Sequence, residues 1–114
     1  MRRSPDRPSQ PVQLPVPGGF LDLGRGELRF HDGTQCSLAE KEAELLAYLI
    51  QHRGRVLSRD ELLARVWRLN PDAVETRTVD MHVARLREKL RDDAEQPRMI
   101  VTVRGRGYTF EADG

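Results

Sequence analysis

Basic side chains recur at helical spacing between residues 76 and 91 of this 114-residue chain. The basic residues of the segment are Arg77, Arg85, Arg87, Lys89 and Arg91, and its only acidic residues are Asp80 and Glu88. A guanidinium group can donate two hydrogen bonds to O6 and N7 of guanine in the major groove, and it also pairs with phosphate. The chemistry that this segment could perform is therefore recognition of nucleic acid.

An apolar stripe in the same segment predicts which side of the helix faces the protein core. The stripe consists of Val79, Val83, Leu86 and Leu90. The opposite side carries Arg77, Met81, Ala84, Arg85 and Glu88. One shoulder carries Thr78 and Lys89, and the other carries Asp80, Arg87 and Arg91. His82 lies at the core boundary on the Thr78 side. Arginine could bond guanine, Met81 or Ala84 could touch a thymine methyl group, and the rim could hold phosphates. An ordinary solvated helix face is the alternative.

The last part of the chain predicts a β-hairpin whose tip is basic. Residues 99–103 and 108–110 have strand composition, and Arg104-Gly105-Arg106-Gly107 lies between them. Beside a recognition helix, Arg104 or Arg106 could approach the minor groove, where A-tracts enhance the negative potential. A plain hairpin turn with solvated arginines is the alternative. A nucleotide-binding loop is excluded, because the third glycine is missing and the segment lies between strands.

The elements that must position these residues are a small sheet and three helices. Alternating apolar and polar residues from about Gly18 to Phe30, with turns at 24–26 and 32–33, predict an antiparallel sheet. A capping box of Ser37 with Glu40 predicts the first helix over 38–53. A second box, Ser58 with Glu61, begins a helix that ends at 70–71, and the third helix spans 76–91. The fold class is α+β.

The chain predicts one folded domain behind a tail. Five of the seven prolines fall within residues 1–17, a composition typical of a disordered linker or tail. Residues 18–114 form the predicted domain, with Trp67 in its core. Asp80 would be costly among phosphates unless it were paired, so we expect a salt bridge to an arginine, with Arg104 one candidate.

Composition excludes several classes of protein. The single cysteine, Cys36, cannot form an internal disulfide, and no histidine lies at metal-site spacing from it, so we expect no metal site and a reducing, cytoplasmic setting. No apolar run is long enough for a membrane span. No nucleophile motif indicates an enzyme, and no cofactor is expected. The net charge of only +1 leaves open a second class of function, a protein-interaction module whose basic face binds an acidic protein partner.

Two long runs carry a resemblance to a known family. They are TRTVDMHVARLREKL at 76–90 and VTVRGRGY at 101–108, supported by VLSRDELL at 56–63 and Val66-Trp67. Together these runs, over about residues 19–111, resemble the effector domain of OmpR/PhoB-type response regulators, which are winged-helix transcription factors of bacterial two-component systems. The resemblance implies an N-terminal antiparallel sheet, a three-helix core and a C-terminal hairpin wing.

The resemblance also implies roles for individual residues. Arg85 would read bases in the major groove, while Arg77, Thr78, His82 and Arg87 would hold phosphates. Thr102 and Arg104 would contact the backbone or the minor groove from the wing. The loop between the second and third helices, with Arg68, Asn70, Asp72 and Glu75, would touch RNA polymerase. Tandem protomers would bind direct repeats in promoter DNA.

The sequence departs from the family pattern at several positions. Ala84 replaces a polar or basic side chain, and Met81 replaces a small β-branched one, so the base preference of relatives is not transferable. Ala39 replaces the usual threonine cap of the first helix, which leaves Ser37 with Glu40 as the expected cap. No receiver domain precedes the Pro-rich stretch, so the chain is either an excised effector domain with its linker or a natural orphan.

Overall fold

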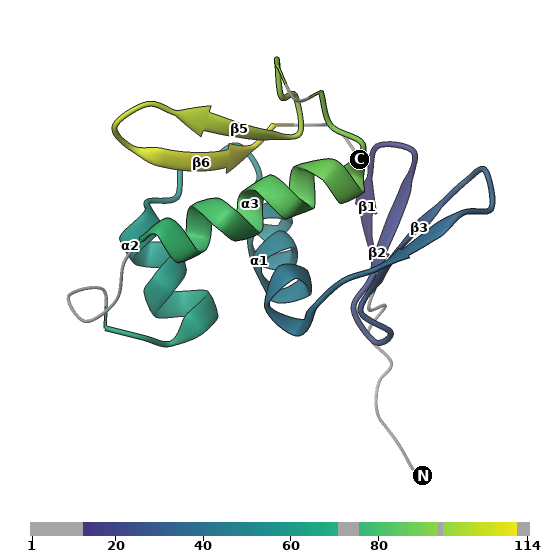
Figure 1. The fold of residues 1–114 in the computed structure, drawn as a ribbon, viewed down its shortest axis with the longest axis horizontal. Helices are drawn as coiled ribbons and strands as arrows, with labels where there is room; N and C mark the ends of the chain where they lie inside the picture. The colour runs from purple at the N-terminus through teal and green to yellow at the C-terminus, as the bar shows by residue number, and fades with distance from the viewer. Residues whose placement is uncertain (1–12, 71–75, 94, 112–114) are drawn as a thin grey trace, which may run out of the picture.

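The structure is a computed structural model, and it describes residues 13–70, 76–93 and 95–111. The elements, in chain order, are β1 (Gln13–Val16), β2 (Gly19–Asp22), β3 (Glu27–Phe30), β4 (Gln35–Ser37), α1 (Glu40–Gln51), α2 (Arg59–Leu62), the π-helical turn η2 (Leu63–Trp67), α3 (Arg77–Leu90), β5 (Ile100–Val103) and β6 (Gly107–Phe110). Figure 1 shows the β5–β6 hairpin alongside α3, with α2 near the N-terminal end of α3 and the four-stranded sheet near its C-terminal end. This is the predicted winged helix-turn-helix.

The N-terminal sheet is antiparallel, as predicted, but it begins earlier than the sequence indicated. Its strand order is β1-β2-β3-β4, and β1 pairs with β2 in the register Leu14↔Leu21. The predicted disordered tail of residues 1–17 is therefore wrong over Gln13–Val16, which form β1. An edge strand needs backbone partners on one side only, so β1 tolerates Pro15, and burial of Val16 in the core holds the strand in place.

The cap of α1 lies two residues later than the predicted Ser37–Glu40 box. Ala39 occupies the N-cap, and its backbone N–H donates to Glu42 Oε1 at 2.9 Å. The reason for the shift is tertiary. Leu38 is buried and donates its N–H to the Gly26 carbonyl at 2.8 Å, which keeps this residue extended against the sheet.

The second helix begins as predicted and ends early. The Ser58 hydroxyl accepts a hydrogen bond from the Glu61 N–H at 3.0 Å, which confirms the predicted N-cap. After one turn of α2 the chain widens into the π-helical turn η2, and Arg68 ends it in the left-handed conformation with φ of 58°. The helical segment ends at Trp67, so the predicted end at 70–71 is three to four residues late.

The core forms where α1, α3 and the hairpin meet. Val79, Val83, Leu86 and Leu90 are all buried, as the apolar stripe predicted. Leu57 joins the hairpin through two backbone hydrogen bonds with Tyr108, of 2.7 and 2.9 Å. Gly107 allows this contact, because a Cβ atom there would lie 2.0 Å from the Leu57 carbonyl oxygen. The hairpin is thereby held against the chain segment that leads into α2.

Candidate nucleic-acid interface

The outward side of α3 is exposed as the sequence predicted. The exposed residues of the helix are Arg77, Met81, Ala84, Arg85 and Glu88, and the shoulder residues Thr78, Asp80, His82, Arg87 and Lys89 are half-buried. This division follows from the helical period alone, since the four apolar residues face α1 and the hairpin. The middle of the exposed side has short or unbranched side chains between two arginines, so a groove wall can approach it closely.

The exposed side of α3 and the β5–β6 turn each carry two arginines whose guanidinium groups are uncommitted. Arg77 and Arg85 of α3 and Arg104 and Arg106 of the β5–β6 turn are exposed, and none of their side chains makes a hydrogen bond or an ion pair within the described parts of the chain. A guanidinium carries five donors, so each of these groups keeps its full donor set for a ligand. The helix and the hairpin tip thus both present free positive charge.

Arg87 is different, because it joins α3 to the hairpin. Its Nε atom donates to the Ile100 carbonyl oxygen at 2.9 Å, and its Nη2 atom donates to the Thr102 hydroxyl at 2.8 Å. Two residues that the sequence assigned separately to DNA contacts therefore lie in direct contact with each other. Thr102 is exposed, so the pair remains on the surface. Its geometry fixes the distance between the recognition helix and β5.

Asp80 forms the predicted salt bridge, but the partner is Arg59 rather than Arg104. Arg59 Nε donates to Asp80 Oδ1 at 2.7 Å, and the Tyr108 hydroxyl donates to the same oxygen at 2.5 Å. Arg104 is exposed at the hairpin turn without such a contact. The cluster Asp80–Arg59–Tyr108 thus ties α3, α2 and β6 together at the N-terminal end of the recognition helix.

The pKa values of this cluster follow from its contacts. Burial opposes ionisation of Asp80, yet the hydrogen bonds from Tyr108 and Arg59 outweigh it, and the pKa of Asp80 lies below its usual value. Burial and the hydrogen bond to Asp80 raise the pKa of Tyr108. Arg59 and Arg87 also lie over the Tyr108 ring, at 5.1 and 5.7 Å from its centroid, within cation–π range. Asp80 is consequently a carboxylate under neutral conditions, with its charge offset by Arg59.

The shoulder near Thr78 contains a fixed histidine. His82 donates from Nδ1 to the Thr78 carbonyl at 2.8 Å, which leaves Nε2 as the unbonded ring nitrogen. The edge of Trp67 packs against the His82 ring, with centroids 4.9 Å apart. Trp67 was predicted as a core residue, but it is only half-buried and packs against the core from outside.

Two other basic residues, at the C-terminal end of α3 and directly after it, already pair with acidic side chains of the protein. Lys89 pairs with Glu42 at 2.7 Å, and Glu42 is only 2% exposed. Burial opposes the charge of Glu42, but the hydrogen bonds from Lys89 and from the Ala39 N–H lower its pKa overall. Arg91 pairs with Asp32 at 3.0 Å and stacks over the Phe30 ring at 3.9 Å. Neither side chain is available to a ligand without breaking these contacts.

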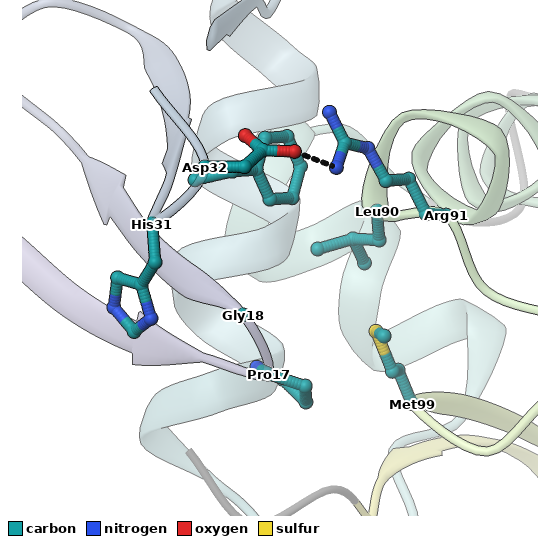
Figure 2. Close-up of a pocket in the computed structure, with 8 residues that line it drawn as sticks. Pro17, Gly18, His31, Asp32, Leu90, Arg91 and Met99 are labelled. Carbon is teal, nitrogen blue, oxygen red and sulfur yellow. Dashed lines mark hydrogen bonds and ion pairs between the residues drawn. The ribbon is translucent and has the colours of Figure 1, made fainter. Parts of the chain in front are cut away.

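A cavity of about 350 Å³ lies beside Arg91, away from the exposed side of α3. Figure 2 shows its lining, with Pro17, Gly18 and His31 from turns of the sheet on one side, Leu90 and Met99 on the other, and the Asp32–Arg91 ion pair at its edge. The hydrogen bonds from Thr34, with that of Arg91, lower the pKa of Asp32 to about 2. The cavity walls are mostly apolar, so they offer no cradle for phosphate.

The predicted polymerase loop is described only in part. Arg68 and Asn70 lie after η2, and Leu69 between them is 42% exposed. Asp72 and Glu75 lie outside the described residues. Across the described ranges no group of three or more histidine, cysteine or acidic side chains is arranged for a metal ion, and no helix has the length and apolarity of a membrane span.

Sequence reasoning missed Arg59 and Tyr108 as site residues. Both occur in the runs that carry the family resemblance, but nothing in their spacing connects them to Asp80. They meet because the Leu57–Tyr108 bridge brings the start of α2 to β6. Only a contact between distant parts of the chain could have revealed them.

Comparisons with known proteins agree with this geometry. Residues 33–110 match the family described as "Transcriptional regulatory protein, C terminal". The alkaline phosphatase synthesis transcriptional regulatory protein PhoP of Bacillus subtilis is 49% identical over 79 residues, covering 68% of this chain and 32% of that protein. The sensory transduction protein RegX3 of Mycolicibacterium smegmatis is 47% identical over 100 residues, covering 82% of this chain and 43% of that protein.

A solved structure of similar fold contains DNA. The DNA-binding domain of Klebsiella pneumoniae RstA, in complex with the RstA box, matches with a TM-score of 0.75 at 30% identity, covering 87% of this chain and 96% of that chain. This chain spans less than half the length of either curated relative. The family consists of DNA-binding domains of transcription factors and not of enzymes. The chain thus belongs to the transcriptional regulatory protein C-terminal family, the winged-helix DNA-binding domains of OmpR/PhoB-type response regulators.

Proposed function

We propose that this domain binds a promoter site with α3 in the major groove and the β5–β6 turn at the adjoining minor groove. The observation that carries the proposal is that uncommitted arginines occur on both elements, Arg77 and Arg85 on the exposed side of α3 and Arg104 and Arg106 at the hairpin tip. The major groove of B-DNA admits an α-helix, and the narrower minor groove attracts arginine.

The residues divide into base readers and phosphate ligands. Arg85, in the middle of the exposed side, donates to guanine, with Met81 beside it on the same side. Arg77, Thr78 and His82 hold one DNA strand at the helix N-terminus. His82 Nε2 is the unbonded ring nitrogen, and it donates to phosphate when both ring nitrogens carry a proton. Arg104 and Arg106 reach the minor groove, where their charge is attracted by the narrow groove.

The Arg87–Thr102 pair contributes a third kind of contact. Two of the Arg87 donors are committed to Ile100 and Thr102, so its remaining donors meet phosphate from a fixed position. An arginine side chain that is already held in this way loses less conformational entropy when it binds phosphate than a freely solvated arginine does. Arg87 and Thr102 therefore act together as one backbone contact between helix and wing.

Selection of binding sites from random duplexes, followed by titration at low and physiological salt, tests this proposal. We expect a preferred site, and the logarithm of the binding constant should fall with the logarithm of salt concentration by about 0.9 per phosphate neutralised. A module whose basic face binds an acidic protein partner would instead show no preferred duplex, and its binding constant for DNA would depend only weakly on salt concentration. That outcome would contradict the proposal.

The proposal extends to the assembly on the promoter. Two protomers bind in tandem on direct repeats, and the segment that begins at Arg68 and Asn70 and continues through Asp72 and Glu75 contacts RNA polymerase. The exposed Leu69 supports the second part, because an apolar side chain in this segment can be buried against a partner. Because bacterial promoter DNA lies in the cytoplasm, a domain that binds it acts there. Footprinting of one- and two-repeat promoters tests the tandem arrangement, and transcription with a Leu69→Ala variant tests the polymerase contact.

A further inference from the structure

We propose that Met81 reads the 5-methyl group of one thymine, about two base pairs from the guanine that Arg85 reads. This inference rests on the proposed function and names a base that the site contains. Among the described residues only two large hydrophobic side chains are exposed, Leu69 and Met81, and Met81 is 49% exposed. Met81 lies on the same exposed side of α3 as Arg85.

The chemistry of the side chain selects the group that it can recognise. A thioether is at best a weak hydrogen-bond acceptor and has no donor, so it cannot read the polar edge of a base. The thymine methyl is the distinctive apolar group on the major-groove edges. Contact with it removes apolar surface from water on both partners, and the unbranched methionine chain adapts to its position.

The spacing along α3 gives the position of the thymine. Residues four apart lie one above the other on the same side of a helix, and each residue rises about 1.5 Å along the axis. Met81 is therefore about 6 Å from Arg85 along the helix, towards its N-terminus. Bases are stacked about 3.4 Å apart, so the two side chains meet positions about two base pairs apart when the helix follows the groove.

The neighbours of Met81 leave it free for this role. The adjacent polar residues of the N-terminal half, Asp80 and His82, are held by Arg59 and by the Thr78 carbonyl. Ala84 is exposed three residues further on and is too short to cover Met81. Between Arg77 and Arg85, Met81 and Ala84 are the exposed residues of α3, whereas Thr78, Asp80 and His82 are half-buried.

The test removes the methyl group from DNA and the thioether from the protein. Sites are first selected with the unmodified domain. Each guanine of the selected DNA is then replaced singly by 7-deazaguanine, and binding of the unmodified domain is compared with that of the Arg85→Ala variant. The guanine whose replacement weakens only the unmodified domain is the one that Arg85 reads. Each thymine is then replaced singly by deoxyuridine, which keeps the pairing and the O4 acceptor but lacks the methyl group. Dissociation constants are measured by fluorescence anisotropy at one salt concentration.

We expect one replacement, about two base pairs from the Arg85-dependent guanine, to weaken binding of the unmodified domain about fourfold, the size expected for one buried methyl group. Met81→Ala should weaken binding to the thymine site and abolish the difference between thymine and deoxyuridine. Leu69→Ala, which removes the other exposed apolar side chain, should leave that difference unchanged. Thermal unfolding checks that each variant is folded, and Met81 is exposed enough for the fold to tolerate its loss.

Methyl sensitivity that persists in Met81→Ala would overturn the inference, and so would the absence of any methyl-sensitive thymine. If Ala84→Gly abolishes the difference in binding between thymine and deoxyuridine while Met81→Ala retains it, the contact belongs to Ala84 and the inference is also overturned. In each of these cases a preferred site remains, so the proposed function stands. A domain that binds all duplexes equally would overturn both.

Discussion

Arg87 of α3 and Thr102 of β5 are joined by a hydrogen bond of 2.8 Å, which links the helix directly to the wing. A second bond from Arg87 to the Ile100 carbonyl, at 2.9 Å, prevents rotation about the first. In the proposed complex with DNA, the contacts of the two elements should therefore be coupled. A shift of the hairpin would displace the phosphate ligand on the helix.

This coupling predicts the behaviour of Arg87→Ala. The variant should bind all duplexes more weakly by a similar factor, because it loses a backbone contact and not a base contact. Thr102→Val should have a smaller effect, and the double variant should be less impaired than the sum of the single ones. Anisotropy titrations of the four proteins on a preferred and a random duplex measure the coupling. Additive losses would show that the two residues act independently.

Arg85→Ala should behave differently from Arg77→Ala. Loss of the Arg85 donors should cost about 1 to 3 kcal/mol on the preferred site and remove the preference at one base pair. Loss of Arg77 should weaken preferred and random duplexes alike. Arg25→Ala controls for the loss of one positive charge, since the Arg25 side chain is 71% exposed and belongs to the turn between β2 and β3, outside α3 and the hairpin. Equal losses on every duplex for Arg85→Ala and Arg77→Ala would refute the division of roles.

The Asp80–Arg59–Tyr108 cluster predicts a dependence of stability on acid pH. The folded-state pKa of Asp80 lies below its unfolded value, so the stabilisation is present above pH about 4 and is lost as the pH falls through the folded pKa. Tyr108→Phe removes one donor and should raise the pKa of Asp80. NMR titration of the Asp80 carboxyl resonance measures the change. Tyr48→Phe is the control, because the Tyr48 hydroxyl donates to Glu61 instead.

Removal of the Tyr108 hydroxyl should also lower the free energy of unfolding. The bond accepted by a half-exposed carboxylate is worth about 1 kcal/mol. Urea denaturation at pH 7 and at a series of lower pH values tests this value. The loss should become smaller as the pH falls through the folded-state pKa of Asp80, and a loss that stays constant while the stability of the unmodified domain falls would argue against a charge-assisted bond.

Gly107→Ala should be among the more damaging single changes in the wing. Its backbone φ of 145° and the 2.0 Å approach of an added Cβ to the Leu57 carbonyl would break the Leu57–Tyr108 bridge. Gly105→Ala also has a positive φ, of 76°, but nothing lies within 4 Å of its added Cβ. We expect Gly105→Ala to cost about 1 to 2 kcal/mol from backbone strain alone and Gly107→Ala to cost more. Chemical denaturation compares the two directly.

Local patterns in the sequence determined the elements and the exposed side of the recognition helix. The stripe from Val79 to Leu90 defines inside and outside within a single helix, so Arg77, Met81 and Arg85 could be placed outward without tertiary information. The Ser58 cap and the hairpin around Gly105 are equally local. These features depend on residues within a few positions of each other, where spacing sets geometry.

The tertiary structure alone decided which charged side chains remain free for DNA. Arg59 meets Asp80, Arg87 meets Thr102, and Lys89 meets Glu42 across separations of 21, 15 and 47 residues. Helical period cannot distinguish the committed Lys89 from the uncommitted Arg85, because their partners come from other elements. The strand β1 is similar, because the pairing with β2 that makes residues 13–16 a strand, and the edge position that tolerates Pro15, are set by the sheet as a whole. Long-range contacts thus separate structural charges from those left for the ligand.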